Sequence, residues 1–331
     1  MLEGLRVDDP EGRYAAVRLC SDLHVENRDF VRENGAWVLK LPDPHLARLE
    51  YELETVDPDG NSQVMLDPGN PNRAPGAFGE KSVALADDYE PPWWLDAQPV
   101  EGTRDSVTVR VLGQELAIEV WSPGDGGELP LLIAHDGPEY DRLAGLTQYA
   151  GAIIGDLATV PFHVALVPPG DRNEWYSASA HYARTLCTRI IPALRDAVPV
   201  AGRPVGMGAS LGGLAMLHAQ RRFPGTFSGL FLQSASFFEP RYDRHESGFP
   251  RYPRIIRFVG GVLRASAAIE TVPVAMTCGT EEENRANNRS MVAALRDQGY
   301  MAKLDEVPDM HNYTGWRDAF DPYLTALLED W

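Results

Sequence analysis

The sequence has little lysine and no long apolar run, and each shortage excludes a class of protein. Only three of its 331 residues are lysines (Lys40, Lys81 and Lys303), so arginine supplies nearly all the positive charge. The net charge is −18, and a nucleic-acid partner, which requires a basic surface, is not expected. The longest apolar runs, such as 131–134 and 229–232, are far too short to span a bilayer, so no membrane partner is expected.

Cysteine is also scarce. Cys20, Cys187 and Cys278 lie far apart, which excludes the spacing of a zinc site and a disulfide framework. We expect them to behave as small buried hydrophobic residues. The first residues lack the basic region, apolar stretch and small-residue cleavage site of a signal peptide, which predicts a cytoplasmic location.

The composition is that of a globular protein, with 44% hydrophobic and 24% charged residues, and the length suits two domains. Residues 1–98 show short apolar–polar alternations separated by turn formers, including Asn34-Gly35, Asp43-Pro44 and Asp57–Gly60. Evenly spaced short strands with such turns predict a small antiparallel β-sandwich. A linker is expected at Glu90–Trp94, where two prolines precede two tryptophans.

The second predicted domain, residues 99–331, alternates strands with helices, which indicates an α/β fold with a mostly parallel sheet covered on both faces. It starts with a hairpin of strands 106–111 and 116–121, and residues 237–270 interrupt the later alternation as an insertion. The further predicted strands are 131–134, 163–167, 205–207, 229–232, 272–278 and 302–307, and the predicted helices are 142–157, 178–194, 211–223, 284–298 and 314–328.

A candidate nucleophile lies in the segment Gly208-Ala209-Ser210-Leu211-Gly212, which matches G-x-S-x-G. The match alone is weak, but an apolar strand precedes it and Gly212-Gly213 opens a helix, as a nucleophile elbow requires. The tight turn exposes the serine hydroxyl, and the helix N-terminus stabilises developing negative charge. The alternative is a glycine-rich turn without chemistry. We expect Ser210 to be the nucleophile.

A serine hydroxyl needs a base, and the base needs an orienting acid. In an elbow-containing fold the chain order is serine, acid, histidine, and only His245 and His311 follow Ser210 at a useful distance. His218 lies two turns along the helix that follows Ser210 and should point away from its hydroxyl. His311 follows the last predicted strand and is preferred over His245, which lies in the insertion. The acid should come from Glu281, Glu282 and Glu283, after the strand ending near Cys278. We choose Glu282, which lies three residues past Gly279, and place Glu283 second and Glu281 third. The two glutamates that are not the acid would be favourable charges at a helix N-terminus.

The oxyanion hole should combine the Leu211 N–H with one from the loop after strand 131–134. That loop includes Pro138, which has no N–H, so Gly137 or Glu139 must supply the second donor. Gly137 is our assignment, with Glu139 as the open alternative.

At this point the chain resembles the enterochelin esterase and esterase D group of serine hydrolases. The resemblance is carried by the following segments: His135–Gly137, Arg172–Tyr176, Gly208–Gly213, Gln233–Phe237 and the His311 to Arg317 region. The N-terminal residues, with Leu66–Pro71 and Gly79–Val83, are similar to the immunoglobulin-like module of enterochelin esterases. The resemblance implies an α/β-hydrolase domain, hydrolysis of a cyclic trilactone siderophore inside the cell, and Glu282 as the acid.

Two departures bear on the substrate. Phe237-Phe238 replaces a tryptophan pair typical of that family, and Glu281–Asn284 differs from the family's usual sequence. A general or carbohydrate-ester (feruloyl or acetyl) carboxylesterase is therefore the alternative function. Some relatives transfer acyl groups instead of hydrolysing them. A non-enzymatic binding protein on the same fold is a third, less favoured hypothesis.

Ferric catecholate siderophores are anionic and aromatic, so arginine and aromatic side chains should bind them. Arg241 and Tyr242 in the predicted insertion are candidates, although nearby acidic residues offset part of the charge. Arg172 and Trp175 follow strand 163–167 at its carboxyl end, where open α/β sheets bind ligands; packing in the core is the alternative for Trp175. The expected partner is a small-molecule ester. The mechanism requires no cofactor and no metal, because any iron would arrive with the substrate.

Overall fold

The computed structural model describes residues 2–41, 45–124 and 127–329 and divides by internal contacts into two compact units. The first unit consists of Met1–Pro91, Gly279–Glu282 and Val307–Gly315, and the second of Pro92–Cys278, Glu283–Glu306 and Trp316–Trp331. The division after Pro91 falls inside the predicted linker, seven residues before the predicted boundary at 98. The two short segments from the C-terminal half are grouped with the first unit because their contacts in space, and not their position along the chain, define the units. The predicted turn at Asp43-Pro44 lies outside the described residues.

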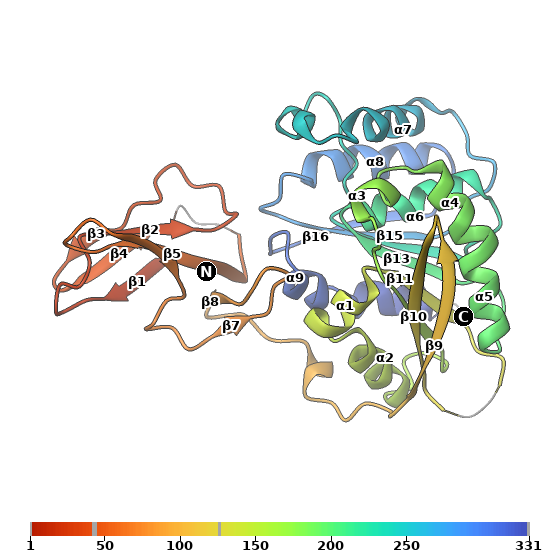
Figure 1. The fold of residues 1–331 in the computed structure, drawn as a ribbon, viewed down its shortest axis with the longest axis horizontal. Helices are drawn as coiled ribbons and strands as arrows, with labels where there is room; N and C mark the ends of the chain where they lie inside the picture. The colour runs from red at the N-terminus through yellow and green to blue at the C-terminus, as the bar shows by residue number, and fades with distance from the viewer. Residues whose placement is uncertain (1, 42–44, 125–126, 330–331) are drawn as a thin grey trace. The chain divides into compact units, whose positions relative to one another are not determined.

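The first unit contains two antiparallel sheets (Figure 1). One has the order β1 (Gly4–Asp8), β4 (Ala36–Lys40), β3 (Val31–Glu33). The other has the order β2 (Ala16–Cys20), β5 (Arg48–Val56), β8 (Lys81–Leu85), β7 (Arg73–Ala74), with β6 (Ser62–Met65) paired to β5. Alternate side chains of β1 and β2 are buried, which is the period-two pattern read from the sequence. The antiparallel strands are confirmed, and the immunoglobulin-like assignment stays a prediction.

The second unit is built on an eight-stranded sheet of order β16-β15-β14-β13-β11-β12-β10-β9. Its strands are β9 (Thr103–Val111), β10 (Gln114–Ser122), β11 (Leu131–His135), β12 (His163–Val167), β13 (Val205–Ala209), β14 (Gly229–Gln233), β15 (Val274–Gly279) and β16 (Ala302–Val307). The strands β12, β11, β13, β14 and β15 are parallel to one another, and the hairpin β9–β10 is antiparallel. The predicted α/β character is confirmed.

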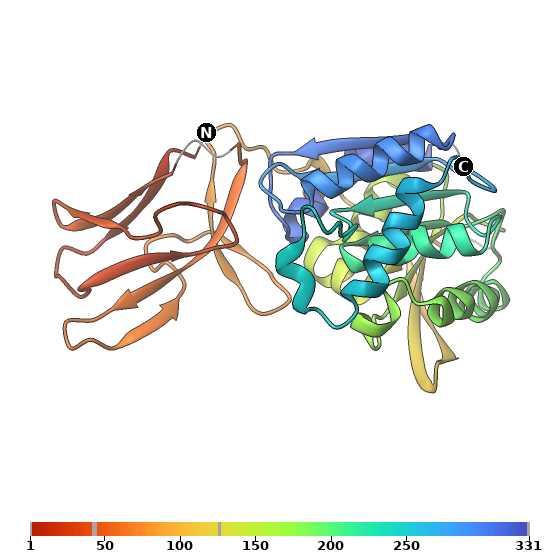
Figure 2. The ribbon, with the colours of Figure 1, turned by 90° about the horizontal axis from the view of Figure 1, so that it is seen from above.

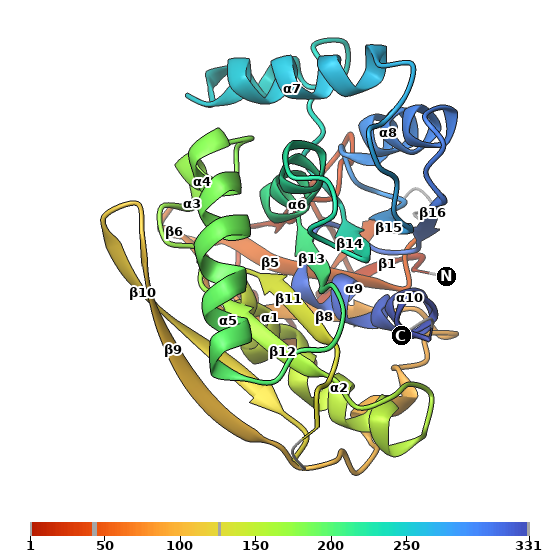
Figure 3. The same ribbon diagram turned by 90° about the vertical axis from the view of Figure 1, so that its right-hand side faces the viewer.

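Helices cover both faces of this sheet, with α1 and α2 on one face and α4, α5 and α6 on the other (Figure 3). The helices are α1 (Gly137–Ala144), α2 (Leu146–Gly155), α3 (Arg172–Trp175), α4 (Ala180–Thr185), α5 (Ile191–Ala197), α6 (Leu211–Arg222), α7 (Tyr252–Arg264), α8 (Arg285–Asp297), α9 (Tyr313–Asp318) and α10 (Thr325–Leu328). The predicted helix 142–157 is two helices, because Gly145 adopts a left-handed φ of 65° between them. A π-helical turn, η2 (Leu186–Ile190), joins α4 to α5.

The predicted insertion, residues 237–270, is the connection from β14 to β15. It contains a short 3₁₀ helix (Arg244–Gly248) and α7, which packs against α8, and Figure 2 shows the two helices next to each other. The buried side chains of α7, among them Ile255, Val259 and Val262, join the main hydrophobic core. The segment is therefore part of the core of the second unit and not only a surface addition.

Within the described ranges, no helix combines the length and apolar character needed to cross a membrane. None of the three cysteines, all within the described ranges, forms a disulfide; Cys278 is buried, while Cys20 and Cys187 are partly buried. Burial raises the pKa of the Cys187 thiol to about 11, which suppresses the reactive thiolate.

Candidate active site

Ser210 lies at a sharp turn between β13 and α6. Its φ of 55° and ψ of −125° are strongly disfavoured for a residue with a side chain. The Ser210 N–H donates to the carbonyl of Gln233 (2.9 Å), and the Ser210 carbonyl accepts from the N–H groups of Ser236 (3.1 Å) and Leu214 (3.2 Å). These three bonds hold the strained backbone, which is the geometry of a nucleophile elbow.

The glycines around Ser210 are required by close backbone contacts. A Cβ at Gly208 would lie 2.6 Å from the carbonyl carbon of Gly212, and one at Gly213 would lie 3.0 Å from the carbonyl oxygen of Gly208. Gly212 faces the next loop, where its Cβ would come within 3.2 Å of the His135 Cβ. The G-x-S-x-G-G sequence is therefore explained by packing that admits no side chains at these positions.

The Ser210 hydroxyl lies 3.1 Å from the hydroxyl of Ser236. Ser236 is buried and lies three residues after the end of β14, which is the strand next to β13. It was not predicted as a site residue from the sequence. Its position just after the carboxyl end of a neighbouring parallel strand could have indicated it, because side chains at that edge of the sheet meet those of the elbow.

The loop after β11 is held by Asp136, whose backbone is left-handed (φ 51°). Arg172 donates to both carboxylate oxygens of Asp136, from Nε at 2.9 and 3.1 Å and from Nη2 at 2.9 Å. The Asp136 N–H also donates to the Tyr176 hydroxyl (3.3 Å). Bidentate guanidinium–carboxylate pairs fix geometry strongly, so Arg172 braces this loop.

His135, just before Asp136, is fully buried and stacks on the Tyr176 ring with 4.4 Å between ring centres. Its Nδ1 lies 3.0 Å from the Gly212 carbonyl and its Nε2 lies 2.9 Å from the Tyr182 hydroxyl. Burial lowers the pKa of His135 to about 4, so the ring is neutral at pH 7. One neutral tautomer satisfies both contacts, with Nδ1–H donating to Gly212 and the tyrosine donating to Nε2. His135 thus ties the β11 loop to the start of α6.

The two predicted oxyanion donors, Leu211 and Gly137, are the first residues of α6 and α1. N–H groups in the first turn of a helix have no acceptor within that helix. The preceding strands are paired, with Ala134 of β11 opposite Met207 of β13. Gly137 also packs tightly on β12, where a Cβ would lie 2.3 Å from the Leu166 Cα.

In the first unit, His311 and Glu282 are hydrogen bonded, with 2.9 Å between the histidine Nδ1 and a carboxylate oxygen. The Glu282 side chain is 1% exposed and its other oxygen accepts from the Gly279 N–H at 2.8 Å. A carboxylate only accepts, so Nδ1 carries the proton of this hydrogen bond. The structure therefore brings the predicted base and acid together within the first unit, whereas Ser210 belongs to the second.

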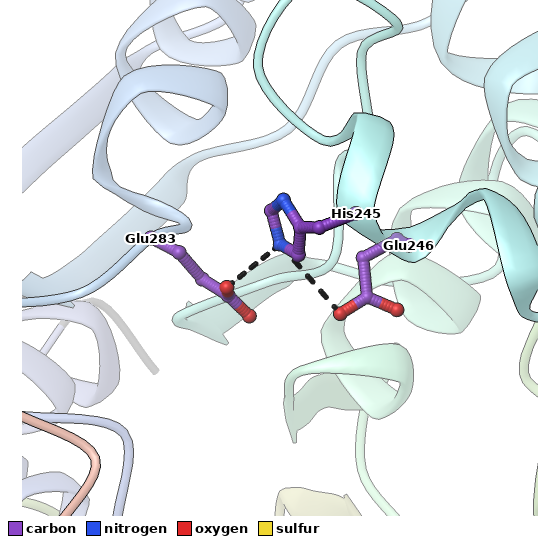
Figure 4. A group of neighbouring side chains, drawn as sticks. All are labelled: His245, Glu246 and Glu283. Atoms are coloured by element: carbon purple, nitrogen blue, oxygen red, sulfur yellow. Dashed lines mark ion pairs between the residues drawn. The ribbon is translucent and has the colours of Figure 1, made fainter.

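Glu283, the second choice for the acid, has a different partner. Its carboxylate lies 2.8 Å from Nε2 of His245, and Glu246 lies 3.8 Å from the same nitrogen (Figure 4). All three residues are in the second unit, and His245 and Glu283 are about half exposed. His245 and Glu283 thus form a surface ion pair, and Glu282 is the glutamate that contacts His311.

The residues predicted to bind substrate have varied environments. Trp175 is 3% exposed and stacks on Tyr182, which favours the packing alternative. Arg172 is engaged with Asp136, as described above. Arg241 pairs with Glu239 (3.0 Å) and lies over the ring of Tyr242, and both Arg241 and Tyr242 stay exposed.

The Esterase family model matches residues 110–327, well over half of the chain. A comparison with the sequences of curated proteins finds no match.

Solved structures show the same fold. The ferric enterobactin esterase from Salmonella typhimurium is 17% identical, with a TM-score of 0.78 and coverage of 98% of this chain and 92% of that one. The enterobactin esterase from Shigella flexneri, solved in the presence of enterobactin, is 17% identical, with a TM-score of 0.76 and coverage of 99% and 91%. A ferulic acid esterase is 15% identical, with a TM-score of 0.58 and coverage of 70% and 98%.

The similarity to enterochelin esterases that the sequence predicted is thus confirmed at the level of fold. With the family match spanning α/β elements from β9 to α10, this chain belongs to the esterase family of hydrolases.

Proposed function

We propose that the protein is a serine esterase that cleaves carboxylic esters through an acyl-enzyme. In this mechanism Ser210 attacks the ester carbonyl carbon while Nε2 of His311 takes the hydroxyl proton. Glu282 holds Nδ1–H and stabilises the imidazolium that forms. His311 then gives the proton to the departing alkoxide, leaving the acyl group on Ser210. Water, deprotonated by His311, attacks the acyl carbon and releases the acid.

The negative charge on the tetrahedral intermediate would be stabilised by the N–H groups of Leu211 and Gly137. Both are at helix N-termini, where the helix dipole also favours negative charge. Removal of one such donor typically costs about 10²- to 10³-fold in kcat. The bracing of the β11 loop by Arg172 and His135 supports this role, because the donors must be in position before charge develops.

The observation that carries the proposal is the backbone of Ser210. A non-glycine residue at φ 55° and ψ −125° is maintained by three backbone hydrogen bonds and by glycines on both sides. Such strain is kept only where the surroundings enforce it. Chain order and connection length agree with the triad: Glu282 follows β15 by three residues and His311 follows β16 by four.

For the substrate, we propose an enterochelin-type trilactone siderophore, with iron arriving as part of the substrate. Enterobactin esterases from two organisms match nearly the whole chain, whereas the ferulic acid esterase matches 70% of it. The exposed Arg241–Tyr242 pair supplies a cation and an aromatic face suited to an anionic catecholate. A cytoplasmic location stays a prediction from the sequence alone.

The chemistry is tested by Ser210→Ala with short p-nitrophenyl esters. We expect turnover to fall to background while the circular dichroism spectrum is unchanged. Retained turnover would reject Ser210 as the nucleophile.

The substrate class needs a separate assay. Ferric and iron-free cyclic triscatecholate lactones should be opened to linear products, which chromatography resolves. Rapid turnover of feruloyl or acetyl sugar esters with no lactone cleavage would instead establish the carbohydrate-ester alternative. No turnover of any ester would favour a binding protein.

A further inference from the structure

A cavity of about 710 Å³ in the second unit opens to solvent and is lined by exposed arginine side chains. Its walls come from the tip of the β9–β10 hairpin, from α4 with the turn η2, and from the end of α6, elements that Figure 3 shows in one view. Four arginines line it, namely Arg110, Arg184, Arg189 and Arg222. His181 lines it as well, and none of the described lining residues is acidic. This is a concentration of cations in a chain whose net charge is −18.

Among the described residues, these four arginines have no carboxylate partner. In the described ranges no Asp or Glu oxygen lies within 4.0 Å of any of them, although Glu115 is opposite Arg110 in the hairpin register. Some arginines elsewhere in the same unit do pair with carboxylates, as Arg172 does with Asp136 and Arg254 with Glu174. Like charges gathered at one cavity repel one another, and a bound anion would remove that repulsion.

The helix that forms one wall has an unusual backbone at this point. At η2 the Ile191 N–H donates to the carbonyl of Leu186, a spacing of five residues instead of four. In a regular α-helix, residues five apart such as Arg184 and Arg189 point about 140° away from each other. A wider π-helical turn reduces that angle, and both side chains line the cavity. Such turns occur frequently at functional sites.

The cavity is separate from the elbow. Ser210 is the N-cap of α6 and Arg222 is its last residue, twelve residues later. At 1.5 Å per residue, about 18 Å of helix separates the two ends. A ligand held at Arg222 therefore does not occupy the oxyanion position at the first residue of α6.

We propose that this cavity binds a small anion that carries two or more linked phosphate groups. Each guanidinium offers a planar pair of N–H donors that can bind two phosphate oxygens. Several guanidinium groups around one cavity can therefore bind several linked phosphates. The volume is in the range of small-molecule sites. Nucleic acid is disfavoured because the remaining surface of this acidic chain repels an extended polyanion. The exposed side chain of Leu112 at the hairpin tip adds one apolar contact for the rest of such a molecule.

The test is isothermal titration calorimetry of the full chain with sodium pyrophosphate at about 50 mM salt. We expect saturable binding at one site, weakened at least tenfold in the double variant Arg184→Gln/Arg189→Gln. The matched control is Arg28→Gln/Arg142→Gln, which removes the same charge from exposed positions outside the cavity and should bind as the wild type does. Circular dichroism checks that both double variants are folded.

Two further measurements make the result specific. The Ser210→Ala variant should bind pyrophosphate unchanged, so that the outcome does not depend on the esterase proposal. Citrate, a carboxylate anion of similar charge, should bind at least tenfold more weakly. The proposal is overturned by an absence of pyrophosphate binding, by equal losses in the two double variants, or by citrate binding as tightly as pyrophosphate.

Discussion

Arg48 and Asp309 form a buried ion pair in the first unit, with 2.6 Å between Nη2 and a carboxylate oxygen. Their side chains are 2% and 7% exposed, and Arg48 also donates to the amide oxygen of Asn312 at 3.2 Å. The neighbouring Ala47 N–H donates to the Pro308 carbonyl at 2.7 Å. Arg48 is the first residue of β5, so a strand of the N-terminal sheet holds both sides of the loop that bears His311.

The first prediction concerns Arg48→Met, which should reduce kcat more than it changes KM. Burial already raises the pKa of Asp309 and of Glu50, which lies 3.5 Å from Arg48. Loss of the guanidinium leaves both carboxyl groups buried without their cation, which costs about 3–5 kcal/mol of stability. The freed loop should displace His311, and a displacement of about 1 Å can lower a rate about 10²-fold. Steady-state kinetics with a p-nitrophenyl ester and thermal unfolding measure the two effects.

The control for this variant is Arg18→Met in the same unit. Arg18 forms an exposed pair with Asp29 at 2.8 Å, and solvent-screened pairs of this kind contribute little to stability. Its kcat should equal that of the wild type. A fully active Arg48→Met protein would show that the ion pair does not position His311.

The second prediction distinguishes the adjacent glutamates. Glu282→Gln should lower kcat by about 10³- to 10⁴-fold, because an amide can present its N–H to Nδ1 and favour the wrong tautomer of His311. Glu283→Gln should leave kcat within about twofold, because its carboxylate contacts His245 at the surface. Both variants lose one charge, so each controls for the other. Equal kcat values would remove Glu282 from the proposed triad.

Much of the fold could be predicted from the sequence because its signals are local. The G-x-S-x-G motif between an apolar strand and a helix locates Ser210, and the parallel strands appear as short apolar runs. The choice of Glu282 over Glu283 could be made only by its distance from a glycine and by family resemblance. The structure adds the contact with His311, which depends on how two loops fold after separate strands.

Other features could not be predicted because they depend on contacts between distant residues. Arg48 pairs with Asp309 across 261 positions of the chain, and no local pattern distinguishes it from a surface arginine. The same is true of Ser236, which meets Ser210 only because β13 and β14 are adjacent. For Trp175 the local signal was misleading. Its position after a strand suggested ligand binding, but its side chain is buried and packs on Tyr182.

The third prediction concerns Gly208→Ala. The added methyl group would lie 2.6 Å from backbone atoms of Gly212, which cannot move without opening the elbow. We expect a loss of about 1–3 kcal/mol in stability, as for overpacked cores, and a much larger relative loss of activity. Gly261→Ala in α7 is the control, because its Cβ would meet no atom within 4 Å and alanine favours helix. Equal thermal stabilities and activities of the two variants would contradict the packing explanation of the motif.

The last prediction concerns His218, which is buried in α6 with its ring edge-on to Phe258 at 4.8 Å between ring centres. Burial, assisted by the charges of Arg222 and Arg254, lowers the pKa of His218 to about 4 from an ordinary value of 6.5. The unfolded chain therefore binds a proton between pH 6.5 and 4 that the folded chain does not bind. The contribution to stability is fully present above pH 6.5 and is lost as the pH falls to 4.

A shift of this size corresponds to about 3 kcal/mol over the window. In His218→Gln this pH dependence should disappear, so its free energy of unfolding should fall less between pH 7 and pH 4 than that of the wild type. Urea denaturation at several pH values gives the difference between the two curves. The similarly buried His135 is present in both proteins, and its contribution cancels in that difference. Parallel curves across the window would mean that His218 titrates near its ordinary pKa and is accessible to water.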